Sequence, residues 1–436
     1  MSLWEEFRYS LIGEKIRSLF PQSFVNRLKH FPAAFLAVLF YRYPARNLRV
    51  IGVTGTDGKT TVVNLIYHIL KEAGLSAAVI STVSAKIGDK EIETGFHVTA
   101  PDPWRLQKFL RRMADLGIEY VVLEATSHGL DQHRLLGCNF MMGVVTNITH
   151  EHLDYHKTYG NYLTAKAKLF KRVKMAILNR DDESFPYLVA KLQSCKDTKR
   201  QSYGIKNKAD FTPETFKFKT QLLGEYNQYN CLAAIAAASA LGVPEEKIRE
   251  AIASFERVEG RMEEIAEGQN FRVIVDFAHT PNALEQVLTH LRKELLLDSA
   301  RGENKLILVF GCAGLRDREK RPMMGEIAAQ YADFTILTAE DPRTEDVNKI
   351  IEEISQGCLA GGAKEVKDTT YYIPHTTYHY FVRIPDRQEA INFAIQKLAK
   401  KDDIVVICGK GHEKSMCYGK TEYPWSDQEA VRKAFE

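Results

Sequence analysis

The chain has 436 residues, more than one ordinary hydrophobic core accommodates, so its length predicts two or three domains. A hydrophobic content of 45% and a charged content of 26% are typical of a soluble globular protein. The formal net charge of +3 is nearly balanced, so the composition does not indicate a nucleic-acid partner.

The seven cysteines and the amino-terminal residues indicate the cell compartment. The cysteines are scattered, without a CxxC pair or a His/Cys metal-binding spacing, which is typical of reduced thiols. The first residues lack the basic region and cleavage site of a secretory signal, and the apolar run at residues 31–41 is shorter than the ~18–20 residues that span a bilayer. We therefore expect a cytoplasmic protein, and we expect it to be a monomer.

Residues 1–48 predict a short helical segment. Apolar residues recur at helical spacing before Pro21, and the apolar run at residues 31–41 follows. Basic residues flank this run, namely Arg27, Lys29, Arg42, Arg46 and Arg49. Contact with an anionic membrane surface through residues 24–49 is one interpretation. We favour the other, a helix packed on the next domain, because apolar runs of this length usually belong to a core.

The stretch around Lys59 carries the clearest chemical signal. Apolar β-branched residues from Val50 lead into a glycine-rich turn, then Gly-Lys-Thr-Thr at residues 58–61, then apolar residues at helical spacing. This order predicts a strand, a phosphate-binding loop and a helix. Backbone N–H groups and the Lys59 ammonium suit phosphate oxygens, and the Thr60 hydroxyl suits Mg²⁺. The loop departs from strict Walker A spacing, because the expected first glycine is Val53.

Predicted strands and helices alternate along the rest of the chain, which indicates parallel sheets covered by helices. In residues 49–258 we expect strands at 78–83, 120–124, 143–147 and 175–179 and helices at 103–116, 159–170, 230–241 and 244–255. In residues 259–436 we expect strands at 273–277, 306–310, 334–338 and 404–408. The predicted fold class is α/β, with a central P-loop-type parallel-sheet ATPase domain and a Rossmann-like C-terminal domain.

Polar clusters follow two predicted strands of the first domain. One cluster is Glu124-Ala-Thr-Ser-His128, and the other runs from Thr146 to Asp154. Ligands gather at the carboxyl ends of parallel strands, so these clusters are expected to line the site. His128, His150 and His156 raise the alternative of a zinc site, which the lack of an accompanying cysteine disfavours.

In order along the chain, these motifs resemble the Mur ligase family, the ATP-dependent amide-bond-forming enzymes of cell-wall precursor synthesis. Within it they are most similar to the UDP-N-acetylmuramoyl-tripeptide synthetases. The motifs are Gly55-Thr-Asp-Gly-Lys-Thr-Thr61, Glu124-Ala-Thr-Ser-His-Gly-Leu130, Gln132-His-Arg134, His152-Leu-Asp-Tyr-His156, Ala165-Lys166, Gly260-Arg-Met-Glu263, Asp276-Phe-Ala-His-Thr-Pro281, Gly311-Cys-Ala-Gly-Leu-Arg-Asp317, Asp341-Pro-Arg343 and Gly409-Lys-Gly-His-Glu413. They cover essentially everything after Arg49.

The resemblance implies that ATP converts a carboxylate to an acyl phosphate, which an amino-acid amine then attacks. The expected catalytic residues are Lys59, Glu124, His152 and Lys166. Two Mg²⁺ sites are implied, one at Thr60 and Glu124 and the other at His152 and a carbamylated Lys166, whose CO₂-derived group would replace an ammonium that cannot bind a cation. A solvated helix lysine is the alternative interpretation of Lys166.

The resemblance also implies where the three substrates bind. ATP is expected at Gly55, Thr56, Asp57, Gly58, Lys59, Thr60, Thr61, Asn147, Asn227, Arg261, Asp317 and Lys320. A muramoyl-peptide-like acceptor is expected at Thr99, Ser127, Gln132 and Arg134. The incoming amino acid is expected at Arg316, Glu340, Asp341, Arg343, Gly409 and Glu413. Because these residues come from both domains, we expect closure of one domain on the other to complete the site.

Two departures from the family pattern leave the substrates open. Diaminopimelate-adding members carry Asp-Asn-Pro-Arg, whose arginine binds the distal carboxylate; here Arg343 is present, but Glu340 and Asp341 replace Asp-Asn, so the added negative charge could instead receive an amine. Typical members also carry an N-terminal uridine-nucleotide-binding domain where this chain has a short helical segment, so we expect the acceptor's nucleotide to be bound weakly or to be absent.

Two alternatives to a murein ligase follow. One is a Mur-type ligase for a non-murein acceptor, of the pseudomurein or polyglutamate type. The other is a non-catalytic nucleotide-binding paralogue, which predicts loss of Lys59, Glu124, His152 or Lys166. All four residues are present.

Overall fold

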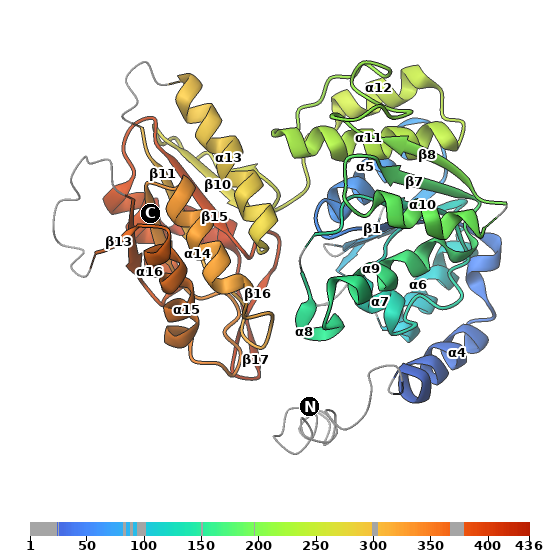
Figure 1. Ribbon diagram of the computed structural model, residues 1–436, viewed down its shortest axis with the longest axis horizontal. Helices are drawn as coiled ribbons and strands as arrows, with labels where there is room; N and C mark the ends of the chain where they lie inside the picture. The colour runs from blue at the N-terminus through green and yellow to red at the C-terminus, as the bar shows by residue number, and fades with distance from the viewer. Residues whose placement is uncertain are drawn as a thin grey trace.

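The computed structural model describes residues 24, 26–81, 84–87, 90–93, 102–149, 151–195, 197–298, 304–366 and 379–436. These residues form two α/β units that face each other, with a helix at the edge of the first unit (Figure 1). A single passage of chain between α12 (Glu245–Ser254) and β9 (Glu263–Glu264) connects the two units. The α/β fold class is confirmed.

The first unit is built on an eight-stranded sheet in the order β4-β3-β2-β5-β1-β6-β7-β8. The strands are β1 (Arg49–Thr54), β2 (Ala77–Ile80), β3 (Ser84–Ile87), β4 (Lys90–Glu93), β5 (Tyr120–Glu124), β6 (Phe140–Val145), β7 (Met175–Asn179) and β8 (Lys199–Tyr203). All pairings are parallel except those of β3 and β4. The expected parallel sheet thus ends at this edge in two antiparallel strands that the sequence did not reveal.

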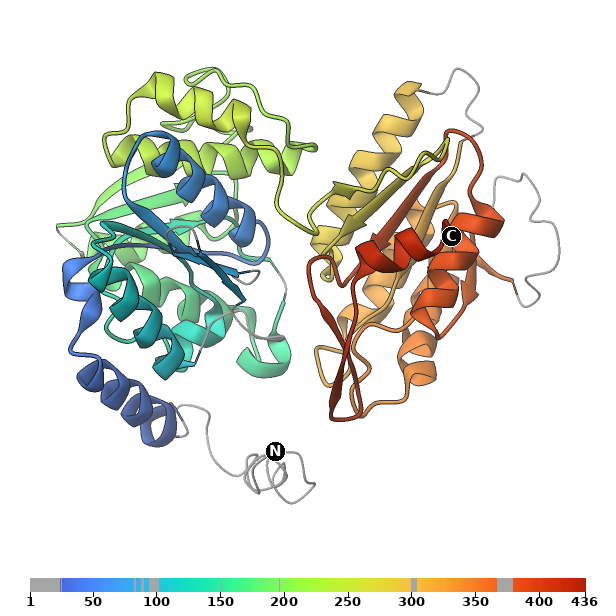
Figure 2. The ribbon, with the colours of Figure 1, turned by 180° about the vertical axis from the view of Figure 1, so that it is seen from behind.

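Helices cover both faces of this sheet (Figures 1 and 2). On one face lie α5 (Lys59–Glu72), α11 (Glu225–Ala240) and α12; on the other lie α6 (Pro103–Asp115), α7 (Ser127–Asp131), α9 (Tyr159–Ala167) and α10 (Phe185–Gln193). Successive residues of β1 supply both cores, since Ile51 and Val53 pack under α5 and Val50 packs on the opposite side.

The second unit is built on a seven-stranded sheet in the order β13-β14-β12-β11-β15-β10-β9. The strands are β9, β10 (Arg272–Asp276), β11 (Leu306–Phe310), β12 (Phe334–Leu337), β13 (Lys364–Glu365), β14 (Tyr380–Arg383) and β15 (Ile404–Cys408); only β9 is antiparallel among the described pairings. The helices α13 (Pro281–Asp298), α14 (Lys320–Tyr331) and α15 (Val347–Ala360) cover one face, and α16 (Arg387–Asn392), η4 (Phe393–Leu398) and α17 (Asp427–Lys433) cover the other. A hairpin, β16 (Ser415–Tyr418) and β17 (Thr421–Pro424), stands apart from the sheet.

Several predicted boundaries need correction. The strand expected at 78–83 ends at Ile80, and the strand expected at 143–147 is β6, which begins at Phe140. The helix expected at 159–170 is α9 followed by a 3-10 turn, η3 (Lys168–Arg172). The alanine-rich helix begins at Glu225 rather than residue 230, because Gly224, at φ 91°, turns the chain into a polar first turn that apolar spacing does not reveal.

The predicted helical segment before the first sheet is present as α4 (Phe31–Phe40). It packs on α6, as we favoured from the sequence, and its buried residues are Ala34, Ala37 and Val38. The helix expected before Pro21 lies outside the described residues. Among the helices of the described part of the chain, none has the length and apolarity that crossing a bilayer requires.

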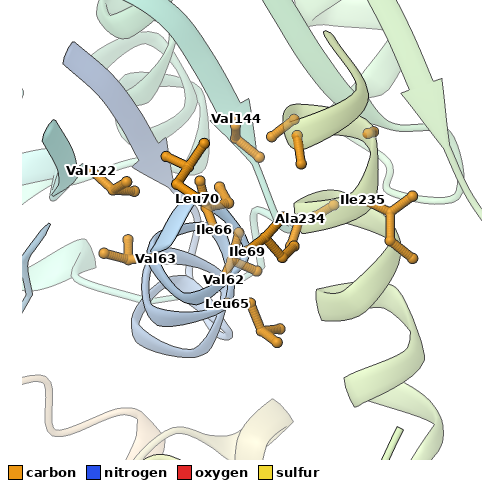
Figure 3. Packing of buried hydrophobic residues seen from close by; sticks show 14 of the residues in the cluster. Val62, Val63, Leu65, Ile66, Ile69, Leu70, Val122, Val144, Ala234 and Ile235 are labelled. Atoms are coloured by element: carbon orange, nitrogen blue, oxygen red, sulfur yellow. The ribbon is translucent and has the colours of Figure 1, made fainter. Parts of the chain in front are cut away.

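Helix α5 is held by a dense apolar contact that fixes the direction of its N-terminus. Its side chains point at Val122 and Val144 of the sheet on one side and at Ala234 and Ile235 of α11 on the other (Figure 3). The α5 residues in this contact are Val62, Val63, Leu65, Ile66, Ile69 and Leu70, each fully buried. The small side chains of α11 allow the two helices to approach closely.

We predict that Ile66→Ala lowers the free energy of unfolding of the first unit by about 2–5 kcal/mol, because it opens a cavity where the structure cannot relax fully. Leu116→Ala is the matched control, since Leu116 is 57% exposed, and it should change stability by less than about 0.5 kcal/mol. Urea unfolding followed by circular dichroism measures both. Equal effects of the two changes would contradict this core assignment.

Candidate active site

The phosphate loop runs from β1 into α5 and is packed on both sides. Its backbone is held from the end of β6, where Asn147 O accepts from Thr56 N (2.7 Å) and Asn147 Oδ1 accepts from Asp57 N (2.9 Å). A Cβ added to Gly58, which has φ 79°, would lie 2.3 Å from Asn230 Oδ1 of α11, and one added to Gly55 would lie 1.7 Å from Thr146 Oγ1. Side chains do not fit at these two positions, so the loop is a fixed cradle of backbone groups.

Lys59, Thr60 and Glu124 meet at the mouth of this cradle. Thr60 Oγ1 donates to Glu124 Oε2 (3.1 Å), and Lys59 Nζ lies 3.9 Å from Glu124 Oε1 while donating to Thr56 O (2.8 Å). Strands β1 and β5 are neighbours, which is why a carboxylate at the end of β5 reaches the start of α5. A buried carboxylate beside a hydroxyl is a hard-oxygen pair that suits Mg²⁺.

Lys166 lies on α9 with its amine directed into the phosphate loop. Nζ donates to Gly55 O (2.5 Å) and lies 4.5 Å above the centre of the Tyr162 ring. Burial and the nearby charge of Lys59 hold the pKa of the Lys166 amine well below its usual range. The interpretation of Lys166 as a solvated lysine is wrong, because the residue is only 2% exposed.

The histidines after β5 and β6 form a cluster in which the rings meet edge to face. His152, at φ 58°, begins α8 (Leu153–His156), and its ring centre lies 4.8 Å from that of His128, which lies 5.5 Å from that of His156. Burial lowers the pKa of His128 to about 3, that of His156 to about 4 and that of His152 well below its usual value. These imidazoles are therefore neutral at pH 7 and offer lone pairs to a cation.

The zinc alternative gains no support from this cluster. His150 lies outside the described residues. Among the residues that are described, no three His, Cys, Asp or Glu side chains gather in an arrangement that could hold a metal ion.

The expected acceptor residues lie on α7 and the turn after it. Arg134 Nε donates to Gln132 Oε1 (2.9 Å), and Ser127 Oγ is buried with no hydrogen-bond partner among the described residues. Thr99 lies outside the described residues. The structure therefore brings three of the four expected residues to one edge of the first sheet, beside the histidine cluster.

The second unit reaches the phosphate loop directly. Asp57 accepts from Thr280 Oγ1 (3.1 Å) and Asn282 Nδ2 (2.7 Å), and Arg261 Nη2 lies 3.4 Å from Thr60 Oγ1. Figure 2 shows the two units facing each other. Thr280 and Asn282 were missed from the sequence; the motif at residues 276–281 signalled the region without assigning either a role.

Three further expected ATP residues lie around this contact. Lys320 Nζ donates to His279 O (2.7 Å) and lies 3.6 Å from Glu151 Oε1 of the first unit. Asp317 is buried, with Oδ2 unpaired among the described residues. Asn227 differs, because its side chain is used inside α11: its Oδ1 accepts from Asn230 Nδ2 (2.9 Å).

The expected amino-acid residues surround the ends of β12 and β15. Asp341 Oδ1 accepts from Lys410 Nζ (2.9 Å) and from Cys417 N (2.9 Å), and Lys410 Nζ also donates to Glu413 Oε2 (2.5 Å). Arg343 Nη1 donates to Gly314 O (2.7 Å). Asp341 and Arg343 both have positive φ, 42° and 53°, a strained conformation that tends to occur at functional sites. Lys410 was missed, although it stands inside the quoted motif at 409–413.

The two acidic residues that replace Asp-Asn add little net charge here. Lys410 pairs with Asp341 and also with Glu413, and burial raises the pKa of Glu340 to about 8, so the Glu340 carboxyl is largely protonated at pH 7. Gly409 lets the side chain of Glu340 approach, since a Cβ there would lie 2.6 Å from Glu340 Oε2. Arg316 is exposed, and its charge contributes to the lowered pKa of His128 on the first unit.

Fold and site together define a phosphate-loop protein of two α/β domains whose site forms where they meet. The sequence matches the family model "Mur ligase middle domain" over residues 53–238 and "Mur ligase, glutamate ligase domain" over residues 260–411. The chain belongs to the Mur ligase family, and it is a ligase. The resemblance inferred from its motifs is confirmed.

Individual relatives agree with this assignment. The UDP-N-acetylmuramoyl-L-alanyl-D-glutamate--2,6-diaminopimelate ligase of Geobacillus thermodenitrificans (strain NG80-2) is 38% identical over 428 residues, which cover 92% of this chain and 81% of the relative. A solved structure of a ligase of that name has 33% identity and a TM-score of 0.57, covering 89% of this chain and 78% of its own. A pseudomurein peptide ligase type C from Methanothermus fervidus shares the fold at 20% identity, with a TM-score of 0.59 and coverage of 88% and 78%.

The raised pKa of Glu340 predicts a specific pH dependence of stability. Between pH 4.5 and about 8 this carboxyl binds more protons in the folded than in the unfolded state, so its contribution to the free energy of unfolding falls as pH rises. We predict that Glu340→Gln removes this decline and is more stabilising, relative to the parent, at pH 8 than at pH 5.

Urea unfolding at the two pH values measures the effect. Glu246→Gln, at an exposed glutamate on α12, is the matched control and should differ from the parent equally at both. If Glu340→Gln also differs from the parent by the same amount at both pH values, the Glu340 carboxyl of the parent is ionised in the folded protein.

Proposed function

We propose that the protein is an ATP- and Mg²⁺-dependent ligase that joins a diamino acid, such as meso-diaminopimelate, to a muramoyl-L-Ala-D-Glu-like acceptor, releasing ADP and phosphate. The observation that carries the proposal is the meeting of Lys59, Thr60 and Glu124 with Arg261 of the other unit at one phosphate loop. The names of relatives with 33% and 38% identity supply the acceptor and the amino acid. We propose residues 49–258 and 259–436 as its two domains, and a cytoplasmic monomer as its form.

The chemistry explains why the site is rich in cations. A carboxylate does not condense with an amine unaided; transfer of the γ-phosphoryl group of ATP to the carboxylate gives ADP and an acyl phosphate, and attack by the amine then expels phosphate. In the first step the carboxylate must approach the γ-phosphate, and the two negative charges repel each other. Lys59 and Arg261 stand where they can offset this repulsion, and Lys320 reaches the same region from the second unit.

The residues present fit two magnesium ions. Thr60 and Glu124 would hold one, and His152 with a carbamylated Lys166 would hold the other. Mg²⁺ there would neutralise charge on the phosphate groups and the acyl phosphate. Support for carbamylation is geometric, because the Lys166 amine is buried, points at the loop backbone and forms no ion pair with a carboxylate among the described residues. A neutral buried amine is the form that adds CO₂.

The state of Asp341 and Glu340 supports a carboxylate-bearing amino acid over a plain amine. Asp341 is already bonded to Lys410 and to Cys417 N, and Glu340 is largely protonated, so the two carboxyl groups offer little to an incoming ammonium. Arg343 follows these residues in the same motif, and its guanidinium is a planar set of donors that suits a carboxylate. This supports diaminopimelate rather than lysine.

We predict that phosphate release by the purified protein requires both an acceptor and an amino acid, and that Lys59→Ala lowers it by roughly 10²–10³-fold. A colorimetric phosphate assay over a matrix of acceptors and amino acids measures this, with murein, pseudomurein-type and polyglutamate acceptors as separate arms. Lys71→Ala is the matched control, at an exposed lysine in the last turn of the same helix. Release that survives Lys59→Ala, or that no amino acid stimulates, would contradict the proposal.

We predict that removal of CO₂ lowers the rate and that bicarbonate restores it. Lys166→Ala should be inactive and partly rescued by short carboxylates such as formate or acetate, which can enter the vacated space. Lys171→Ala, at an exposed lysine of η3, should behave like the parent. Indifference of the parent to CO₂, together with no rescue of Lys166→Ala, would count against the carbamate.

A further inference from the structure

Helix α4 presents its large apolar side chains to solvent and its small ones to the protein. Ala34 and Ala37 are 1% and 0% exposed. The outward residues are Phe31, Phe35, Leu36, Leu39 and Phe40 of α4, together with Leu28 of the π-helical turn that precedes it, η1 (Asn26–His30), with exposures from 41% to 69%. We call these six residues the apolar α4 face. A helix that merely packs on its domain buries its large side chains, so this orientation needs another explanation.

The apolar α4 face is fixed in place from behind. Val38 packs on Gly137, where an added Cβ would lie 2.8 Å from Val38 Cγ2, and the Phe31 ring lies 5.5 Å from that of His133. Asn26 Nδ2 donates to Asp131 Oδ2 (2.7 Å). In Figures 1 and 2 the helix lies along the outer edge of the first unit, away from the second. Its orientation is therefore set by packing.

Aromatic residues widen this surface. The Phe40 ring lies 5.6 Å from that of Trp104, which is 42% exposed on α6, and the Tyr41 ring lies 5.0 Å from that of Phe40. Tryptophan and tyrosine are enriched where a protein meets the boundary between lipid headgroups and acyl chains, because their rings are apolar at one end and polar at the other.

The chain segment that carries the apolar α4 face has charges of one sign. Residues 24–49 contain no aspartate or glutamate. Arg27, Arg42 and Arg46 are exposed and form no ion pair among the described residues, whereas Arg49 is paired with Glu119 (2.9 Å). An apolar surface on a basic segment complements an anionic, apolar partner. Two copies meeting through this face would bring basic segments together.

We propose that the apolar α4 face docks on the surface of an anionic lipid bilayer. Ten helical residues span about 15 Å, roughly half of the hydrocarbon thickness, so the helix lies in the interface rather than crossing it. The phenylalanine and leucine side chains enter the acyl boundary, and the arginines contact lipid phosphates. The proposal does not depend on the reaction proposed above.

Docking would place the acceptor side of the protein at the bilayer. Asn26 and Phe31 contact Asp131 and His133, which flank Gln132 in the turn after α7. An acceptor that reaches this turn would therefore approach from the membrane side. This orientation rests on the proposed acceptor site, whereas docking itself does not.

Co-sedimentation of the full-length protein with vesicles tests the proposal. We expect binding to vesicles of 30% phosphatidylglycerol in phosphatidylcholine, at least roughly tenfold weaker binding to pure phosphatidylcholine, and weakening of the anionic binding as salt rises. Phe35→Glu with Leu39→Glu should weaken anionic binding by roughly tenfold or more. Leu296→Glu with Leu297→Glu, at exposed leucines on α13, is the matched control and should bind like the parent.

A second variant guards against misfolding of the first. Arg27→Glu with Arg46→Glu leaves the apolar residues intact and should remove the preference for anionic vesicles. Circular dichroism and ATP turnover in solution should match the parent for every variant. Failure of the parent to bind vesicles would overturn the proposal, and so would equal binding by the parent and the variants. A third contradicting result is a dimer of the parent in sedimentation velocity that the Phe35→Glu, Leu39→Glu protein does not form, with no vesicle binding by either protein.

Discussion

Repulsion between two anions is the constraint on which the site depends. In the proposed reaction a γ-phosphate and a carboxylate must come within bonding distance, and at 4 Å two unit charges repel by about 1–4 kcal/mol at effective dielectric constants between those of water and a protein surface. The site offsets this repulsion with a rigid arrangement of hydrogen-bond donors and cations. These are the backbone groups of the phosphate loop, where Gly55 and Gly58 leave no room for larger side chains, Lys59 beside the loop, and Arg261 from the second unit. The core under α5 keeps that arrangement in place, because it fixes the helix whose N-terminus points at the phosphates.

The same constraint accounts for the division of the protein into two α/β units. Thr280 and Asn282 of the second unit donate hydrogen bonds to Asp57 of the loop. Lys320 of the second unit lies beside Glu151 of the first, so this cation reaches the site only when the units are in contact. Separation of the units would leave the loop open to nucleotide. Contact would exclude water that could otherwise hydrolyse an acyl phosphate.

Local features of the sequence predicted the fold well, whereas contacts between residues far apart in the sequence could not be predicted. Apolar runs such as Tyr120–Glu124 and Leu306–Phe310 gave the central strands with correct limits, whereas β8, with the sequence Lys-Arg-Gln-Ser-Tyr, is an edge strand whose polar residues hide it. The phosphate loop and Glu124 were found because their chemistry is encoded in adjacent residues. The contact of Asp57 with Asn282, 225 residues away, and the pairing of Asp341 with Lys410 depend on how two sheets are placed. The outward face of α4 was equally hidden, because a helix that is apolar all round has no periodicity that shows which side is buried.

The central claim is that a carboxylate is activated by direct phosphorylation at this loop, and isotope transfer tests it most directly. An acceptor labelled with oxygen-18 in its reacting carboxylate is incubated with the protein, ATP, Mg²⁺ and diaminopimelate, and the released phosphate is analysed by mass spectrometry. An acyl phosphate intermediate predicts that one labelled oxygen passes from each reacted carboxylate to the phosphate, because the amine displaces that oxygen with its phosphoryl group. Amide product accompanied by unlabelled phosphate would contradict the account.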